Sequence, residues 1–153
     1  MTPFSRPTRT LGDLSATAAA KLIATAADVA LIVDAEGVIC DMAFGSDSLK
    51  DLGYERWVGQ PWIQTVTKES RPKIEALLRE ADSVSAPRWR QVNHPSEAGA
   101  DLPLAYCAVK VDDVSRADSL GHSVVFGRDL RAMASMQQSL VDAQQASLHE
   151  HWR

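Results

Sequence analysis

The sequence has little cysteine, no excess of basic residues and no long apolar run. Its two cysteines, Cys40 and Cys107, form neither a CxxC pair nor a cluster with zinc-ligand spacing, so we expect two buried, reduced thiols. A net charge of -4 argues against a surface dedicated to nucleic-acid phosphates. No segment approaches the roughly 18 apolar residues of a transmembrane helix, and the N-terminus lacks a signal-peptide layout. We therefore expect a cytoplasmic chain with no membrane contact.

Residue patterns for catalysis and metal binding are missing as well. The four histidines are scattered along the chain. No nucleophile–base pair, phosphate-cradling glycine loop or carboxylate pair stands out. We predict no catalytic residues, no metal site and no enzymatic activity.

What is present is the composition of one globular domain, with 45% apolar and 24% charged residues over 153 positions. Residues 1–12 hold two prolines and are expected to be a flexible lead-in. Residues 13–27 are rich in alanine and have apolar residues at helical spacing, with Asp13 or Ser15 available as the N-cap. This segment is predicted to be a short helix that leads into the domain.

A β-hairpin is predicted next. Residues 29–34 and 38–44 are apolar runs on either side of an acidic turn that contains Gly37. The polar stretch from 45 to 62 is typical of one or two short helical turns.

One longer helix and three further strands complete the predicted domain. Residues 65–84 carry Pro72 in the first turn and a helical stripe for the core, which comprises Ile74, Leu77, Leu78 and Ala81. The strand-like runs lie at 88–94, 102–111 and 121–128, with an expected bulge near Ala105 or Ala108. This order predicts an α+β fold with a five-stranded antiparallel sheet, a helical crossover on one face, an N-terminal helix and a long C-terminal helix.

The passage from the last strand into the C-terminal helix has its own signals. Gly127 is expected to let the backbone turn. Asp129 is expected to cap the helix, because its carboxylate can accept hydrogen bonds from the first N–H groups and complements their positive end.

The C-terminal helix carries a partly apolar stripe at three- and four-residue spacing. An isolated helix of this length is marginally stable in water, so it needs a surface to pack on. We predict a dimer or partner interface here, with the N-terminal helix as a second contact; the alternative is a helix that folds back on its own domain or frays. The interface residues are Leu130, Met133, Met136, Gln137, Leu140, Val141, Gln144 and Leu148.

Three segments together resemble PAS domains. They are "ALIVDAEGVICDMAFGSDSL", similar to the opening hairpin, "LGYERWVGQPWIQTV", similar to the stretch before the small helices, and "VVFGRDLRAM", similar to the exit into a helix. The resemblance covers roughly residues 28 to 131 and implies a PAS fold. It divides the chain into a lead-in (1–12), a PAS domain with its N-terminal helix (13–127) and a linker helix (128–153).

The tail "GRDLRAMASMQQSLVDAQQASLHEHWR" resembles the Q-linker of PpsR/CrtJ-type repressors of photosynthesis genes in purple bacteria. The resemblance implies a non-enzymatic fragment for homodimerisation or higher oligomerisation and signal input, with the tail truncated before a next PAS domain. It implies an antirepressor or a bacteriophytochrome as protein partner. DNA would be bound only through a helix-turn-helix domain that this chain does not contain.

PAS domains often hold a small molecule between the sheet and the helical crossover. The predicted helix at 65–84 has no histidine to bind haem, and both cysteines lie on strand-like runs rather than in the insert where a photoactive flavin domain carries its cysteine. We therefore expect no cofactor and a core filled by its own side chains. Two alternatives stay open, namely a ligand-sensing PAS domain of a histidine kinase or cyclase with a signalling coiled coil, and a free-standing adaptor complete at Arg153.

Overall fold

The computed structural model describes residues 2–82, 86–97, 99–111 and 122–151. Its centre is one antiparallel sheet of five strands in the order β2-β1-β5-β4-β3. The predicted α+β fold is therefore confirmed. The strands are β1 (Val29–Val33), β2 (Ile39–Phe44), β3 (Arg90–His94), β4 (Leu102–Lys110) and β5 (Ser123–Asp129).

The predicted hairpin is formed by β1 and β2, and its turn is held by Asp34. The Asp34 carboxylate accepts hydrogen bonds from the backbone N–H groups of Glu36 (2.9 Å) and Val38 (3.0 Å), and these bonds, that of Val38 first, lower the pKa of Asp34. Gly37 supplies the positive φ, 82°, that closes the turn.

The expected bulge in β4 is wrong. Residues 102–106 of β4 pair without interruption with β3, and residues 104–110 pair without interruption with β5. The irregularity lies instead in the β1–β2 register, between Ile32 and Val33. Residues on both faces of β4 are covered, so its apolar residues are not confined to one face. The irregular alternation of apolar and polar residues in this strand therefore does not indicate a bulge.

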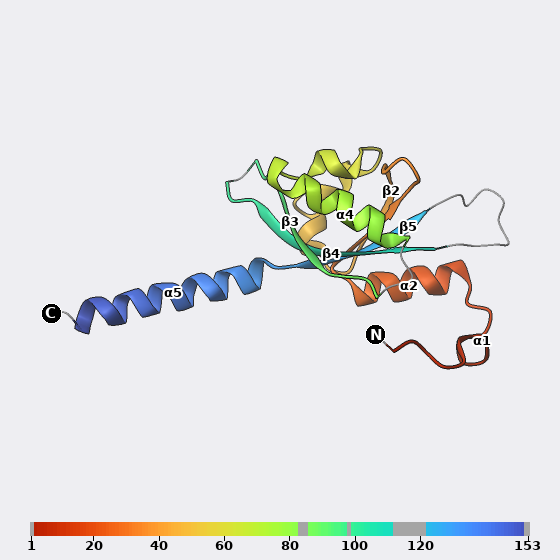
Figure 1. Ribbon diagram of the computed structural model, residues 1–153, viewed down its shortest axis with the longest axis horizontal. Helices are drawn as coiled ribbons and strands as arrows, with labels where there is room; N and C mark the ends of the chain where they lie inside the picture. The colour runs from red at the N-terminus through yellow and green to blue at the C-terminus, as the bar shows by residue number, and fades with distance from the viewer. Residues whose placement is uncertain (1, 83–85, 98, 112–121, 152–153) are drawn as a thin grey trace.

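Helical segments lie on both sides of the sheet, and α5 follows it (Figure 1). The helix predicted at 13–27 appears as α2, which begins after the N-cap Ser15. The helix predicted at 65–84 appears as α4, but it begins only at Arg71: residue 65 ends the short turn η2 and residues 68–70 form the separate short turn η3. Residues 83–84 of this prediction lie outside the described residues. The short turns predicted between β2 and α4 also form. The helices are α1 (Pro7–Thr10), α2 (Ala16–Ala26), α3 (Asp47–Lys50), η1 (Tyr54–Trp57), η2 (Trp62–Thr65), η3 (Lys68–Ser70), α4 (Arg71–Ala81) and α5 (Arg131–His151).

The sheet has one core face and one outer face. The helical segments from α3 to α4 lie over the core face, and α2 lies against the opposite side (Figure 1). The predicted stripe of α4 is confirmed, with three members buried and Leu78 half-buried at its edge. The largest fully buried side chains include Trp62, Tyr106, Leu31, Ile39, Leu49, Ile74, Leu77 and Leu104. No helix within the described ranges is both long and apolar enough to cross a membrane.

Candidate interaction site at the C-terminal helix

The last strand runs straight through Gly127, so the expected turn at this glycine is wrong. Gly127 pairs with Val29 on one side and with Tyr106 on the other. A Cβ at this position would lie 2.6 Å from Cγ1 of Val29 and 2.9 Å from Cε1 of Tyr106. Glycine is required here because these two side chains approach the backbone closely, and the sequence does not distinguish this need from that of a turn.

The start of α5 is fixed by Asp129 and by the neighbouring strand. The Asp129 carboxylate accepts hydrogen bonds from the backbone N–H of Arg131 (3.0 Å) and from its guanidinium (2.7 Å to Nη2), and the bond from the guanidinium raises the pKa of Arg131. The N–H of Leu130 donates to the carbonyl of Pro103 in β4 (3.0 Å). The first turn of the helix is thus attached to the sheet by both backbone and side chain.

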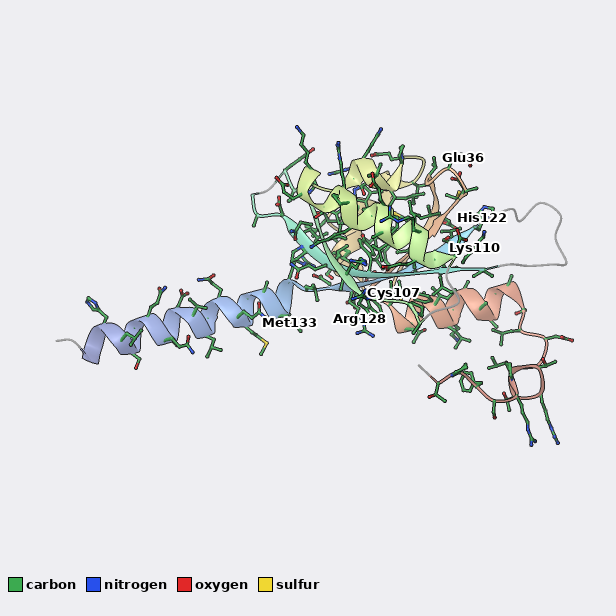
Figure 2. The ribbon with its side chains drawn as sticks, in the orientation of Figure 1. Glu36, Cys107, Lys110, His122, Arg128 and Met133 are labelled. Atoms are coloured by element: carbon green, nitrogen blue, oxygen red, sulfur yellow. The ribbon has the colours of Figure 1, made fainter. Side chains whose placement is uncertain are left out.

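Beyond its first turn α5 points away from the domain (Figure 1). The alternative in which it folds back on its own domain is not what the structure shows. Leu130 is half-buried, whereas the other predicted interface residues are exposed, and Met133 projects from the helix into open space (Figure 2). The exposed fractions of the apolar ones are 57% for Met133, 73% for Met136, 61% for Leu140, 44% for Val141 and 61% for Leu148. Gln137 and Gln144 are exposed on the same stretch. We call these eight residues the α5 stripe.

A groove of about 430 Å³ lies where α5 leaves the sheet. Its walls come from η1 and the turn before it, from the loop that leads into β4, from the start of β4 and from the first residues of α5. The lining is mostly apolar and includes Leu52, Tyr54, Leu102, Pro103, Arg131 and Ala134. The base of the helix therefore offers apolar surface that is continuous with one edge of the α5 stripe, at Ala134.

The interior between the helical segments and the sheet is occupied by aromatic side chains. Trp57 stacks on His94 with ring centroids 4.1 Å apart, and Trp62 meets Tyr106 edge-on at 5.3 Å. All four side chains are buried. Trp57, Trp62 and Tyr106 therefore serve as core packing residues.

His94 is a buried polar residue that sequence reasoning missed. Its Nδ1 lies 2.7 Å from the carbonyl oxygen of Thr65, and its Nε2 lies 2.7 Å from the hydroxyl of Tyr106. Because a carbonyl only accepts, Nδ1 carries the proton and Nε2 accepts from the tyrosine. Burial lowers the pKa of His94 to about 4, and burial raises the pKa of Tyr106. The available signal was the two-residue period with Val92, which places His94 on the core face.

The two cysteines differ, and the expectation that both are buried is wrong. Cys107 is buried on the outer face of the sheet, whereas Cys40 is exposed beside the β1–β2 irregularity. Burial, with the nearby charge of Asp34 as a second cause for Cys40, raises the pKa of both thiols. Within the part of the chain that the structure describes, no three histidine, cysteine or acidic side chains gather as a metal site would require.

The sequence of the chain is similar to that of a known protein. No protein-family model matches the chain. The protein CrtJ of Rhodobacter capsulatus is 28% identical over 131 residues, which cover 83% of this chain and 26% of CrtJ. The chain therefore spans about a quarter of that relative.

Solved PAS domains share the fold. The PAS domain of an HTR-like protein from Haloarcula marismortui has a TM-score of 0.54 at 16% identity and covers 82% of this chain and 99% of that one. The PAS domain of BvgS from Bordetella pertussis has a TM-score of 0.51 at 16% identity and covers 84% and 95%. The chain thus has the PAS fold with a projecting C-terminal helix, and in sequence it is similar to the protein CrtJ.

Proposed function

We propose that this chain is a non-enzymatic signal-input and homodimerisation module of a PpsR/CrtJ-type transcription regulator, with the α5 stripe as its dimer contact. The observation that carries the proposal is the exposure of five large apolar side chains on one stretch of a helix that leaves the domain with no surface of its own to pack on. The similarity to CrtJ supports the assignment to a regulator.

A second copy is the occupant that best satisfies the chemistry of the stripe. Burying one large apolar side chain contributes about 2 kcal/mol, so two stripes of five such side chains offer a large driving force even after part of it is lost to ordering. Glutamines at positions 137 and 144 would weaken such a seam while fixing its register. The groove at the base of α5 adds apolar area beside the stripe.

The resemblance to PpsR/CrtJ-type repressors extends the proposal to partners. An antirepressor or a bacteriophytochrome would act on this module by changing the geometry of α5, and DNA would be contacted only through a helix-turn-helix domain outside this chain. The filled interior favours a protein partner over a small ligand as the source of the signal, because the volume under α4 is occupied by Trp57, Trp62, Tyr106 and His94. The ligand-sensing alternative predicts a bound metabolite, and native mass spectrometry that finds one would favour it.

Sedimentation equilibrium tests the dimer contact. Met133→Glu combined with Leu140→Glu places two charges in the centre of the stripe and should convert a dimer into a monomer with an unchanged far-UV spectrum, since each buried, unpaired charge costs several kcal/mol. The matched control is Ser135→Glu with Ser139→Glu, which adds the same charge on the opposite side of the helix, where both serines are exposed. A double variant in the stripe that keeps the dimer mass would exclude α5 as the contact, and a wild-type chain that stays monomeric at high concentration would refute the dimer itself.

A further inference from the structure

Asp28 connects the start of the sheet to its exit. The residue lies between α2 and β1, and its backbone N–H donates to the carbonyl of Gly127 at 3.0 Å. Its carboxylate oxygen Oδ2 accepts a hydrogen bond from the N–H of Asp129 at 2.8 Å, and its carbonyl accepts from the N–H of Gly45 at 2.9 Å. One half-buried residue therefore contacts the ends of β2 and β5 together.

The bond to Asp129 continues the sheet where the strand ladder ends. Pairing between β1 and β5 stops at Val29 and Gly127, two residues before Asp129. The Asp28 side chain reaches past that last pair and accepts from the backbone N–H of Asp129, two residues before α5 begins. A charged acceptor makes this hydrogen bond stronger than a neutral one would be.

The C-terminal end of α2 lies just before Asp28 in the chain and packs closely against Gly45. The N–H of Ala27 donates to the carbonyl of Ile23, which closes the last turn of the helix. Gly45 lies so near this turn that a Cβ on it would sit 2.0 Å from the carbonyl oxygen of Ala27 and 2.7 Å from that of Ala24. The end of α2 thus cannot shift on the sheet without moving Asp28.

We infer that Asp28 is a positioning residue that couples the direction of α2 to the direction of α5 through its hydrogen bond to the N–H of Asp129. A partner that displaces α2 then changes the path of α5, and the reverse holds equally. A regulatory role for this coupling rests on the proposed function. The coupling itself acts within a single chain and requires no dimer.

Spin-label distances within one chain test the coupling. Labels are placed at Lys21→Cys on α2 and Ser139→Cys on α5, both exposed positions outside the α5 stripe, in a chain whose own cysteines are replaced by Cys40→Ser and Cys107→Ala. Labelled chain is diluted into excess unlabelled chain so that only intramolecular distances are read. Asp28→Ala removes the acceptor, Asp28→Asn keeps a carbonyl oxygen in its place, and Asp51→Ala is the control at an exposed carboxylate.

We expect narrow distance distributions for the parent chain, for Asp28→Asn and for Asp51→Ala, and a broadened distribution for Asp28→Ala. Hydrogen exchange at Asp129 and Arg131 should be about fivefold faster in Asp28→Ala, the equivalent of about 1 kcal/mol for one hydrogen bond. If Asp28→Ala does not fold, Asp28→Ser, whose side chain is too short to reach, replaces it.

Two results would overturn the inference. One is an Asp28→Ala distribution as narrow as that of the parent chain, and the other is an Asp28→Asn distribution as broad as that of Asp28→Ala. A merely structural role would lower the melting temperature and leave the distance distribution of the folded chain unchanged. Failure of the proposed dimer is read separately by sedimentation and does not affect these distances.

Discussion

Lowering the pH should destabilise the domain through His94. The imidazole is fully buried, and its two nitrogens are committed to the carbonyl of Thr65 and the hydroxyl of Tyr106 in the neutral form. Adding a proton would turn Nε2 into a donor and place an unpaired charge among Trp57, Trp62 and Tyr106. The folded domain therefore resists protonation at this residue more than the unfolded chain does.

The sign and size of the effect come from the pKa of His94. Its value is 6.5 in the unfolded reference and about 4 in the fold, so the unfolded chain binds the proton first. Stability is complete above pH 6.5 and is lost as the pH falls towards 4, by about 3 kcal/mol in all. Between about pH 7.5 and about pH 5 the loss should be about 2 kcal/mol, before carboxylates with lowered pKa values such as Asp34 begin to contribute.

Urea unfolding followed by tryptophan fluorescence measures this loss at the two pH values, with the protein concentration held constant because a dimer would add its own dependence. His94→Gln cannot titrate, so it should be less stable than the parent chain at neutral pH and nearly flat between the two conditions. His122→Gln serves as the control and should keep the dependence of the parent chain. A parent chain that loses less than about 0.5 kcal/mol, or a His94→Gln variant that loses as much as the parent, would refute the reasoning.

Three further outcomes are expected. Gly127→Ala should lower the free energy of unfolding by about 1–3 kcal/mol in urea denaturation, because its Cβ would overlap the ring of Tyr106; an unchanged midpoint would contradict the close approach. A thiol reagent should modify Cys40 in the folded protein and Cys107 only on unfolding, and two thiols that react in the native protein would contradict the burial of Cys107. Ser15→Ala removes the hydroxyl that accepts from an N–H of α2, so it should cost about 1 kcal/mol and speed hydrogen exchange in that helix alone.

Much of the fold follows from local patterns, and what local patterns missed is set by long-range contacts. The Asp34–Gly37 turn and the helix that begins at Arg71 are specified by residues within a few positions of each other, so the sequence predicts both. His94 stands beside a proline at the end of a strand-like run, and nothing nearby shows that Tyr106 and Thr65 will surround it. Its partners come from other elements, which one sequence without pairing information does not reveal.

The candidate site shows the same division. The spacing of Met133 and Leu140 identified an apolar helix face in advance, and the structure places that face in the open. The attachment of the helix was harder to predict. Asp129 was expected to cap the helix, but the contribution of Asp28 depends on the neighbouring position of β1 and β5 in the sheet. Strand order is a global property, so side chains that bridge two strands are found only once it is known.

The position of β5 in the sheet also has a consequence for how the domain folds. The strand that comes last along the chain lies in the middle, so residues as distant in sequence as Val29 and Gly127 must meet before the sheet is whole. Until then β1 and β4 each expose an unpaired edge, which is a template for aggregation. During synthesis the β1–β2 pair and the β3–β4 pair are both made before β5. The strand that joins the two pairs is also the strand that leads into α5. Completion of the fold and presentation of the projecting helix are therefore a single event.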